Sequence, residues 1–305
     1  MSMEKSEYIW LNGKFVPWDE AKTHVLDHGL HYGTGVFEGI RAYKTQDGNT
    51  AIFRLDEHVG RLVKSAKALR MSLPYNKEEI KGIVVETVRK NGLEECYIRP
   101  LAWYGYRELG LRAKDLPVNF MVAVWRWGKY LGKEGVRAKI STWIRNSPNA
   151  FPNEAKICGS YVNAVFASEE VRNAGYDEAI MLDHRGFIAE GPGENLFIVE
   201  MERLLTPPLY VSILPGITRA AVITLAQNLG FVVAETDITR SRLYNADEAF
   251  FTGTAAEVTP IYEVDDRKIG EGKTGPVTKR IQEEFFAVIR GKREKYGQWL
   301  TYVYK

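Results

Sequence analysis

The sequence has few cysteines, no long hydrophobic run and almost no net charge, and each absence excludes a class of protein. Cys96 and Cys158 are the only cysteines in 305 residues, too few for a disulfide framework, which indicates a reducing, cytoplasmic setting. The 41 basic and 39 acidic residues leave a formal net charge of +2, which does not favour nucleic-acid binding. No stretch reaches the apolar length of a membrane helix, about 18 residues. The N-terminus also lacks a signal-peptide pattern. We therefore expect neither nucleic acid nor a membrane as a partner.

The rest of the composition is that of an ordinary globular protein. Hydrophobic residues make up 45% and charged residues 26% of the chain, which excludes a disordered protein. The length is sufficient for two domains and a large core. Three glycines lie within residues 127–135, between two strand-rich blocks, so we place an interdomain segment there. We expect a smaller N-terminal domain over residues 1–126 and a larger C-terminal domain over residues 136–305.

Hydrophobic periodicity predicts a mixture of strands and helices. The Asn12-Gly13 and Asp47-Gly48 dipeptides predict two hairpins, over residues 8–18 and 36–54, and Asp56 is a candidate N-cap for the next helix. Helices are predicted over residues 56–71, 77–90, 160–173, 217–229 and 276–290. Strands are predicted over residues 97–104, 118–127, 138–143, 178–183, 187–189, 195–199, 231–235 and 248–251. Because these elements show no regular βαβ alternation, we expect an α+β fold rather than a Rossmann sheet.

Three histidines, His24, His28 and His31, lie close together in the sequence. On a helix, His24 and His28 would share a face, an arrangement that suits a metal ion. The run 27–35 contains three glycines, however, and predicts a loop rather than a helix. No HExxH or CxxC pattern accompanies it. We therefore interpret these histidines as hydrogen-bonded structural residues and expect no metal site.

Four short segments each allow a functional and an ordinary structural interpretation. Residues 191–195 (GPGEN) lack the third glycine and the following helix of a dinucleotide loop, and predict a tight turn. Residues 214–219 open a helix, which is either an ordinary helix start or an anion site formed by free N–H groups. Residues 253–257 form a turn of small side chains that a ligand could approach closely, or a simple tight turn. Lys156 precedes a helix, and its position alone does not distinguish it from a solvated surface lysine.

Together and in this order, these segments resemble the fold-type IV pyridoxal-phosphate (PLP) transaminases, and among them most closely the branched-chain amino acid aminotransferases. The resemblance extends from residue 8 to residue 280 and is carried by residues 32–39, Arg61, residues 97–100, Lys156 with Tyr161, and residues 190–197, 214–219 and 253–257. It implies a two-domain fold, with a small N-terminal domain, a larger PLP-binding domain and the cofactor between them.

The resemblance implies a catalytic role for Lys156. This lysine would form the Schiff base with PLP and then move a proton between the substrate Cα and the cofactor. An amine must be partly neutral to attack an aldehyde, so we expect its pKa to be depressed. Glu190 matches the carboxylate that faces the pyridine nitrogen, and Tyr161 matches the phenol near the 3-oxygen. The other implied cofactor contacts are Arg61 and the backbone of Ile217, Thr218 and Thr254 at the phosphate, with Gly193, Asn195 and Leu214.

The same resemblance implies a substrate pocket that accepts two kinds of side chain. The α-carboxylate would meet the Tyr97 hydroxyl and the backbone of Gly253, Thr254, Ala255 and Ala256. The walls around an apolar side chain would be Tyr32, Phe37, Trp127 and Tyr130. Arg99, with the hydroxyls of Tyr32 and Tyr130, would bind the distal carboxylate of glutamate.

The implied reaction is a ping-pong transamination between L-branched-chain amino acids (leucine, isoleucine, valine) and 2-oxoglutarate. Alternatives on the same fold are a D-amino-acid or amine transaminase and a PLP-dependent lyase. The D-amino-acid branch carries an Arg-x-His pair where an ungapped alignment places Leu109-Gly110-Leu111 here. A non-catalytic PLP-binding protein is disfavoured because Lys156, Glu190 and Arg61 are all present. Pro192 departs from the small residue common in the family, and proline lacks a backbone N–H.

The resemblance also implies a homodimer or a larger homo-oligomer. In the family, the loop near residues 106–112 and Tyr32 reach toward the neighbouring subunit.

Overall fold

The computed structural model describes residues 4–127 and 135–304, which divide into two compact units. The described part of the first unit comprises residues 4–127, 155–159 and 287–304. The second comprises residues 135–154 and 160–286. Residues 155–159 and the C-terminal segment therefore belong to the first unit, although they follow residue 136 in the chain. Most of the segment 127–135, where we expect a linker, lies outside the described residues.

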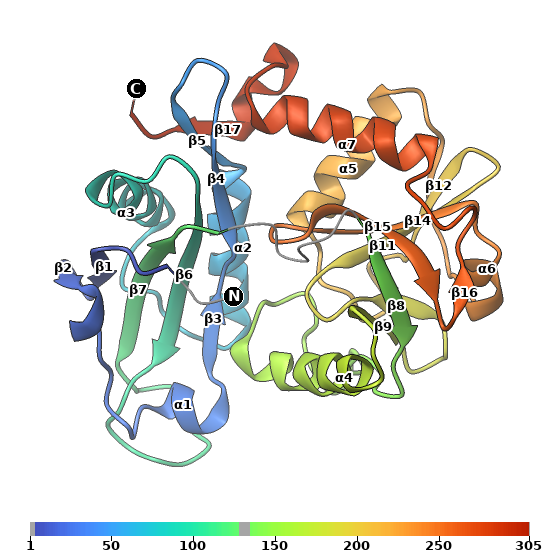
Figure 1. Ribbon diagram of the computed structural model, residues 1–305. Helices are drawn as coiled ribbons and strands as arrows, with labels where there is room; N and C mark the ends of the chain where they lie inside the picture. The colour runs from blue at the N-terminus through green and yellow to red at the C-terminus, as the bar shows by residue number, and fades with distance from the viewer. Residues whose placement is uncertain (1–3, 128–134, 305) are drawn as a thin grey trace. The chain divides into compact units, whose positions relative to one another are not determined.

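The first unit is built on a sheet whose described strands pair antiparallel, seen mainly among the blue and green strands of Figure 1. The order of its described strands is β17 (Leu300–Tyr302), β5 (Thr50–Phe53), β4 (Ile40–Lys44), β6 (Cys96–Tyr104), β7 (Val118–Trp125), β1 (Tyr8–Leu11) and β2 (Lys14–Pro17), with β3 (Gly35–Phe37) also paired to β6. The two predicted hairpins are confirmed, since β1 pairs with β2 and β4 pairs with β5. The C-terminal strand β17 completes the sheet against β5.

Two helices cover this sheet, α2 (Leu55–Ala68) and α3 (Lys77–Lys90). The helix α3 begins at a capping box in which Asn76 accepts from the N–H of Glu79. The prediction that Asp56 is the N-cap of α2 is wrong. The helix begins at Leu55, after Arg54 in the left-handed conformation. The Asp56 carboxylate instead accepts from Lys77 at 2.6 Å, an exposed contact that ties α2 to α3.

The glycine-rich run 27–35, predicted as a loop, contains the short helix α1 (His28–Tyr32). Two contacts explain the difference. The His28 ring bonds Thr34 Oγ1 and the Gly110 carbonyl, both at 2.7 Å, which fixes the start of the turn. Gly33 then adopts a left-handed conformation and donates its N–H to the Gly29 carbonyl, which ends the helix. The histidine is thus a hydrogen-bonded structural residue, as predicted.

Among the described residues, the second unit is a six-stranded barrel with three added strands. In the described chain, β10 (Ile188–Glu190), β9 (Glu178–Leu182), β8 (Val136–Ile140), β15 (Glu257–Val264), β14 (Glu248–Gly253) and β11 (Asn195–Glu200) form the ring, which the β10–β11 pairing closes. The strands β12 (Arg203–Thr206) and β13 (Val233–Glu235) extend the sheet, and β16 (Arg267–Lys268) pairs with β15. Among the described strands of this unit, the parallel pairs are β8 with β9, β8 with β15, and β12 with β13.

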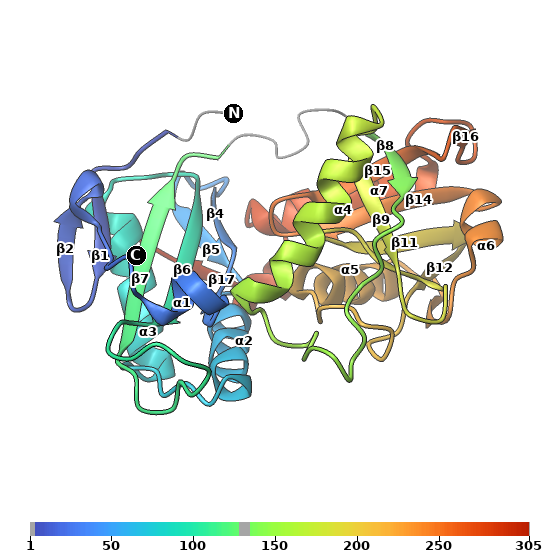
Figure 2. The same ribbon diagram turned by 90° about the horizontal axis from the view of Figure 1, so that it is seen from below.

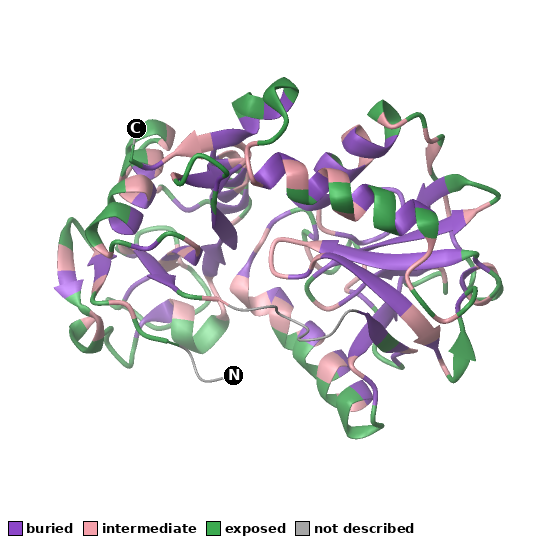
Figure 3. Ribbon diagram, turned by 45° about the horizontal axis from the view of Figure 1, so that its top comes forward, coloured by how far each residue is buried: buried purple, intermediate pink, exposed green. Residues whose placement is uncertain are grey.

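Alternation along the strands separates the barrel core from the helix-covered face. In β9, Ile180 and Leu182 belong to the barrel core, whereas Ala179 and Met181 pack with Ala167 and Val171 of the helix α4 (Tyr161–Asn173). Figure 2 shows α4 lying along β8 and β9. The strands are mostly buried, and the outer face of α4 is exposed (Figure 3).

The second unit also contains α5 (Ile217–Asn228), α6 (Arg240–Tyr244) and most of α7 (Pro276–Ile289). The helix α5 packs on β14. None of the helices within residues 4–127 and 135–304 has the length and apolar character needed to cross a membrane.

Candidate active site

Lys156 lies in the segment 155–159 of the first unit and is held between a strand and a helix. Its carbonyl accepts from the Phe37 N–H at 3.1 Å, and its N–H donates to Ser65 Oγ on α2 at 2.9 Å. Its ammonium group lies over the Phe37 ring, 4.9 Å from the centroid. Burial and the positive charge of Arg61 lower the pKa of Lys156 to about 8. The depressed pKa that the resemblance implied is therefore present.

A fully buried carboxylate, Glu38, organises the charges beside Lys156. Glu38 accepts from Arg61 Nε at 2.6 Å and Nη2 at 2.8 Å, and from His58 Nδ1 at 2.7 Å. Burial alone would raise the pKa of Glu38, but Arg61 and His58 overcome it and hold the pKa at about 2. Burial lowers the pKa of His58. Because an ionised carboxylate only accepts hydrogen bonds, the neutral His58 carries its proton on Nδ1.

Aromatic rings enclose Arg99 on β6. Its guanidinium lies 4.7 Å from the Phe37 ring centroid, 5.4 Å from that of Tyr97 and 5.9 Å from that of Trp125, and it donates to the Tyr97 hydroxyl at 3.3 Å. The Trp127 ring stacks on Tyr97 with centroids 4.8 Å apart. Such rings hold a cation in place while leaving hydrogen-bonding nitrogens for another ligand.

In the second unit, Glu190 ends β10 and is surrounded by donors. Its carboxylate accepts from Arg145 Nη2 at 3.0 Å, from Asn195 Nδ2 at 2.9 Å and from the Leu214 N–H at 3.1–3.2 Å. Both Glu190 and Arg145 are buried. A buried carboxylate with this many donors is fixed in orientation, and the donors compensate its charge.

Asn195 also contacts the turn that precedes α5. Asn195 also donates to the Leu214 carbonyl at 3.0 Å. A Cβ on Gly216 would lie 1.9 Å from Asn195 Oδ1, so only glycine fits at this helix N-cap. Ile217 and Thr218 then form the first turn, whose N–H groups have no intrahelical partner.

The turn of residues 253–257 joins β14 to β15, with Gly253 opposite Glu257 in the register. It carries Thr254, Ala255 and Ala256, with Ala256 buried. Small side chains leave the backbone of this hairpin end open to a ligand.

The structure brings some of the predicted residues together within each unit. In the first unit, Arg61, Phe37, Tyr97 and Arg99 surround Lys156, and Trp127 stacks on Tyr97. In the second, Asn195 and Leu214 bond Glu190, and Ile217 and Thr218 follow that turn. Tyr161 is the first residue of α4. Tyr32 is exposed on α1, and its ring contacts are with His28 and His31. Tyr130 lies outside the described residues.

Residues 35–264 match the amino-transferase class IV family. The branched-chain-amino-acid aminotransferase of Pseudomonas aeruginosa is 48% identical, an alignment that covers 99% of this chain and 100% of that protein. The solved branched-chain amino acid aminotransferase of Escherichia coli has a TM-score of 0.96 at 45% identity, covering 98% of this chain and 100% of the other. This chain belongs to the class IV aminotransferase family.

A third relative, the branched-chain amino acid aminotransferase of T.th., was solved in complex with N-(5'-phosphopyridoxyl)-L-glutamate. It has a TM-score of 0.94 and 49% identity, over 98% of this chain and 99% of that one. The same enzyme was solved with 4-methylvaleric acid and with pyridoxamine 5'-phosphate. These likenesses confirm the predicted α+β fold and the resemblance to the branched-chain aminotransferases.

The donor groups of this class IV aminotransferase fit PLP. An aldehyde needs an amine with a lowered pKa, and Lys156 has one. A pyridine nitrogen needs a fixed carboxylate, and Glu190 is held by Arg145 and Asn195. A phosphate needs backbone donors such as the first turn of α5, which Gly216 leaves open.

Four residues of the aminotransferase site were missed by sequence reasoning: Glu38, His58, Ser65 and Arg145. Glu38 lies within residues 32–39, which carry the resemblance, but the resemblance assigns it no role. A weak signal existed on α2, because residues 58, 61 and 65 recur at helical spacing and so lie on one face of the helix. For Arg145 we find no signal, since it lies in an irregular segment and reaches Glu190 only through the fold.

The Pro192 departure is compatible with the turn of this aminotransferase. The Gly191 N–H donates to the Glu194 carbonyl at 2.7 Å, and the Gly193 N–H donates to the Glu194 side chain at 2.7 Å. The turn is therefore closed by its neighbours, and the N–H that proline lacks is not needed. In the described part of the chain, no group of three or more His, Cys, Asp or Glu residues could hold a metal ion.

Proposed function

We propose that this chain is a PLP-dependent aminotransferase that exchanges an amino group between L-branched-chain amino acids (leucine, isoleucine and valine) and 2-oxoglutarate. The observation that carries the proposal is Lys156 with a pKa of about 8, beside Arg61 and an ordered carboxylate. The relatives with 45–48% identity over nearly the whole chain are named for this activity, which supports it.

We assign the cofactor contacts as follows. Lys156 binds the cofactor covalently, and Glu190 faces its pyridine nitrogen with Tyr161 near the 3-oxygen. The guanidinium of Arg61 and the backbone of Ile217, Thr218 and Thr254 bind phosphate, and Gly193, Asn195 and Leu214 complete the contacts. When bound, PLP supplies an aldehyde for the amino group and a ring that withdraws electrons from the substrate Cα.

Proton transfer at the substrate Cα is the task of Lys156 once its nitrogen is released. With a pKa of about 8, much more of this amine is neutral near pH 7.5 than for an ordinary lysine, whose pKa is 10.5. Hydrogen bonds to Ser65 Oγ and to the Phe37 N–H fix the backbone of Lys156, so its side chain can move while its Cα stays in place. Glu38 keeps one negative charge beside the cations Arg61 and Lys156.

Substrate recognition combines apolar walls with one cation. Phe37, Trp127, Tyr32 and Tyr130 contact a branched side chain, and the Tyr97 hydroxyl with the backbone of residues 253–256 binds the α-carboxylate. Arg99, enclosed by rings, binds the distal carboxylate of glutamate or 2-oxoglutarate. N-(5'-Phosphopyridoxyl)-L-glutamate and 4-methylvaleric acid bound to the T.th. enzyme represent both substrate types and support this dual recognition.

Replacing Arg99 tests that recognition. In Arg99→Met, kcat/KM for glutamate falls about 10–100-fold because a charged hydrogen bond to the distal carboxylate is lost. The value for leucine changes less than about 3-fold, since the apolar walls stay. Steady-state kinetics with each amino donor measures both. The exposed Arg203→Met serves as control. Equal losses for leucine and glutamate would contradict the assignment.

The substrate branch is tested by turnover with 2-oxoglutarate as acceptor. We expect glutamate to form from L-leucine, L-isoleucine and L-valine, and not from D-leucine or a primary amine. Leu109, Gly110 and Leu111, where the D-amino-acid branch has its Arg-x-His pair, favour this outcome. Activity confined to D-amino acids or amines would assign the chain to a sister activity on the same fold.

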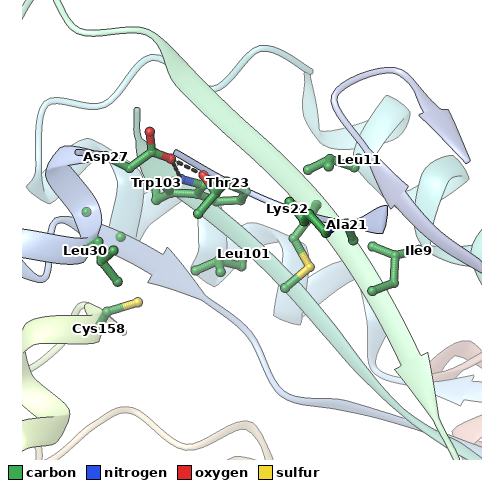
Figure 4. A pocket seen from close by; sticks show the side chains of 13 residues that line it. Ile9, Leu11, Ala21, Lys22, Thr23, Asp27, Leu30, Leu101, Trp103 and Cys158 are labelled. Carbon is green, nitrogen blue, oxygen red and sulfur yellow. Dashed lines mark hydrogen bonds between the residues drawn. The ribbon is translucent and has the colours of Figure 1, made fainter. Parts of the chain in front are cut away.

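We further propose that the enzyme is at least a homodimer. In the first unit, an apolar pocket of about 300 Å³ is lined by residues including Leu30, Leu101, Trp103 and Cys158 (Figure 4). The lining residue Leu30, on α1, is largely exposed, as is Leu111 of the loop 106–112. In the second unit, Val162, Val165 and Phe166 form an exposed apolar stripe on α4. Exposed apolar groups of this kind support a partner subunit.

Light scattering of the active enzyme checks the assembly. We expect a mass of at least twice the 34.7 kDa of one chain. A fully active species at the mass of one chain would contradict the dimer. We place the enzyme in the cytoplasm, which the free thiols of Cys96 and Cys158 support.

A further inference from the structure

A second buried carboxyl group, Glu194, lies in the turn that carries the cofactor-binding residues of the second unit, and the reaction as described does not use it. It stands between Gly193 and Asn195 and is 4% exposed. Its Oε2 accepts from the Gly193 N–H at 2.7 Å. Burying a carboxyl group costs free energy unless its charge is removed or compensated, so Glu194 needs an explanation.

The Glu194 side chain packs over Gly191 of its own turn, and the base of Glu194 lies against Gly253 of the turn 253–257. A Cβ on Gly191 would lie 3.1 Å from Glu194 Cγ and 3.2 Å from its Cδ. A Cβ on Gly253 would lie 3.3 Å from Glu194 Cβ. Glycine at position 191 thus leaves room for the Glu194 side chain over its own turn, and glycine at position 253 lets the turn 253–257 approach the backbone of residues 193–194 closely. The proposed ligands of PLP and of the α-carboxylate lie on these two turns.

The charged neighbours of Glu194 are mostly negative. Glu178, the first residue of β9, is also buried, and Glu190 adds a further negative charge. The second carboxyl oxygen of Glu194, Oε1, is buried and accepts from no donor among the described residues. Burial, with the charge of Glu178, raises the pKa of Glu194 well above its usual range. Burial raises the pKa of Glu178 as well. The charged groups that face Glu178 from outside the pair are Arg172 of α4 and Asp177. The N–H of Ala179 donates to Glu178 at 3.0 Å.

Two carboxyl groups can bond to each other only if one carries a proton, because ionised carboxylates are acceptors alone. We propose that Glu194 is protonated, donates a hydrogen bond to ionised Glu178, and by this contact positions the turn that carries Glu190 and Asn195. The charges around the two carboxyl groups decide which of them carries the proton. Each carboxyl group accepts from one backbone N–H, but Glu178 has in addition the cation Arg172 near it, whereas Glu194 has the anion Glu190. The protonated side chain also keeps a second negative charge away from Glu190.

The two glutamine isosteres give an asymmetric test. In Glu194→Gln, the amide N–H₂ replaces the acid proton toward Glu178 and the amide oxygen still accepts from Gly193. In Glu178→Gln, the ionised acceptor is lost, and one amide oxygen must accept from both Ala179 and Glu194. We therefore expect Glu194→Gln to melt at or above the temperature of the wild-type apoprotein, and Glu178→Gln to melt below it. The reverse order would overturn the polarity of the pair.

The proton on Glu194 also makes the stability of the protein depend on pH. A carboxyl whose pKa is raised by folding binds a proton in the native state that the unfolded chain has released, so stability falls as pH rises above about 4.5. Glutamine has no such proton. The melting-temperature difference between Glu194→Gln and wild type should therefore grow by more than about 3 °C from pH 5 to pH 8. Glu169→Gln, at an exposed position on α4, should show a constant difference.

An infrared difference spectrum reports the proton directly. A protonated-carboxyl band should be present in the wild-type apoprotein near pH 7, shift on exchange into deuterated water and disappear in Glu194→Gln. Absence of that band, or a pH-independent stability difference, would overturn the proposal. Neither readout depends on the cofactor.

The positioning role rests on the proposed function and has its own readout. Glu194→Gln should retain PLP with an unchanged visible absorbance band. Glu194→Ala, which removes the buried side chain packed over Gly191, should weaken PLP binding at least about 10-fold. Equal affinity of Glu194→Ala and wild type for PLP would refute positioning. Failure of the wild-type protein itself to bind PLP would instead refute the proposed function and leave the acid pair standing.

Discussion

Lys156→Ala is expected to lower kcat by at least about 10³-fold, the largest effect on activity that we predict for a single change. The variant removes both the amine that binds the cofactor and the group that moves the proton at the substrate Cα. The hydrogen bonds of Glu38 with His58 and Arg61 remain in place when the lysine side chain is shortened, so the variant should fold.

Two measurements check this expectation. Steady-state kinetics with L-leucine and 2-oxoglutarate gives kcat. Reduction with borohydride followed by peptide mass analysis should place the cofactor on residue 156 of the wild-type protein and on no residue of the variant. Lys64→Ala, an exposed lysine on the same helix as Arg61, is the control and should match wild type. Substantial activity in Lys156→Ala would mean that another lysine serves the cofactor.

Glu38→Gln should lower the free energy of unfolding by about 3–5 kcal/mol at pH 7, because it removes the buried carboxylate that accepts from both Arg61 and His58. The matched control is Glu57→Gln, on the same helix as Arg61, which breaks a more exposed pair with Arg54 and should cost less than about 1 kcal/mol. Urea unfolding of both apoproteins measures the difference. A loss for Glu38→Gln no larger than that of the control would contradict the account of the buried network.

The pH dependence of that loss has a defined sign. Folding lowers the pKa of Glu38 from 4.5 to about 2, so its contribution is present in full above pH 4.5 and is lost as pH falls toward 2. The stability difference between wild type and Glu38→Gln should therefore stay constant from about pH 7 to about pH 5 and shrink below that range. In Glu38→Gln the pKa of Lys156 should also fall further below 8, since Glu38 is a negative neighbour that raises it.

The sequence predicts the elements of this protein better than their boundaries and connections. The hairpins at Gly13 and Gly48 and the helix that starts after Asn76 are encoded by local turn and cap chemistry, and the structure confirms all three. The helix α1 was missed because His28 is held by Thr34 and Gly110, and the second of these contacts spans 82 residues. The barrel also depends on pairings between strands distant in sequence, such as β8 with β15, that no local pattern indicates.

The candidate site was also predicted only in part from the sequence. Single segments such as residues 214–219 were ambiguous, and only their joint order indicated the family. Glu38 and Arg145 were missed because a buried ion pair is defined by two residues distant in sequence. Sequence periodicity shows which residues share a helix face, but it does not show which carboxylate meets which guanidinium.

The most direct test of the central claim is the absorbance spectrum of the purified protein with PLP, before and after L-leucine is added without a keto acid. The account predicts a visible band from cofactor bound to Lys156, which L-leucine converts to the shorter-wavelength amine form and 2-oxoglutarate restores. A protein that shows no visible band after addition of PLP, or a band that L-leucine leaves unchanged, would contradict it.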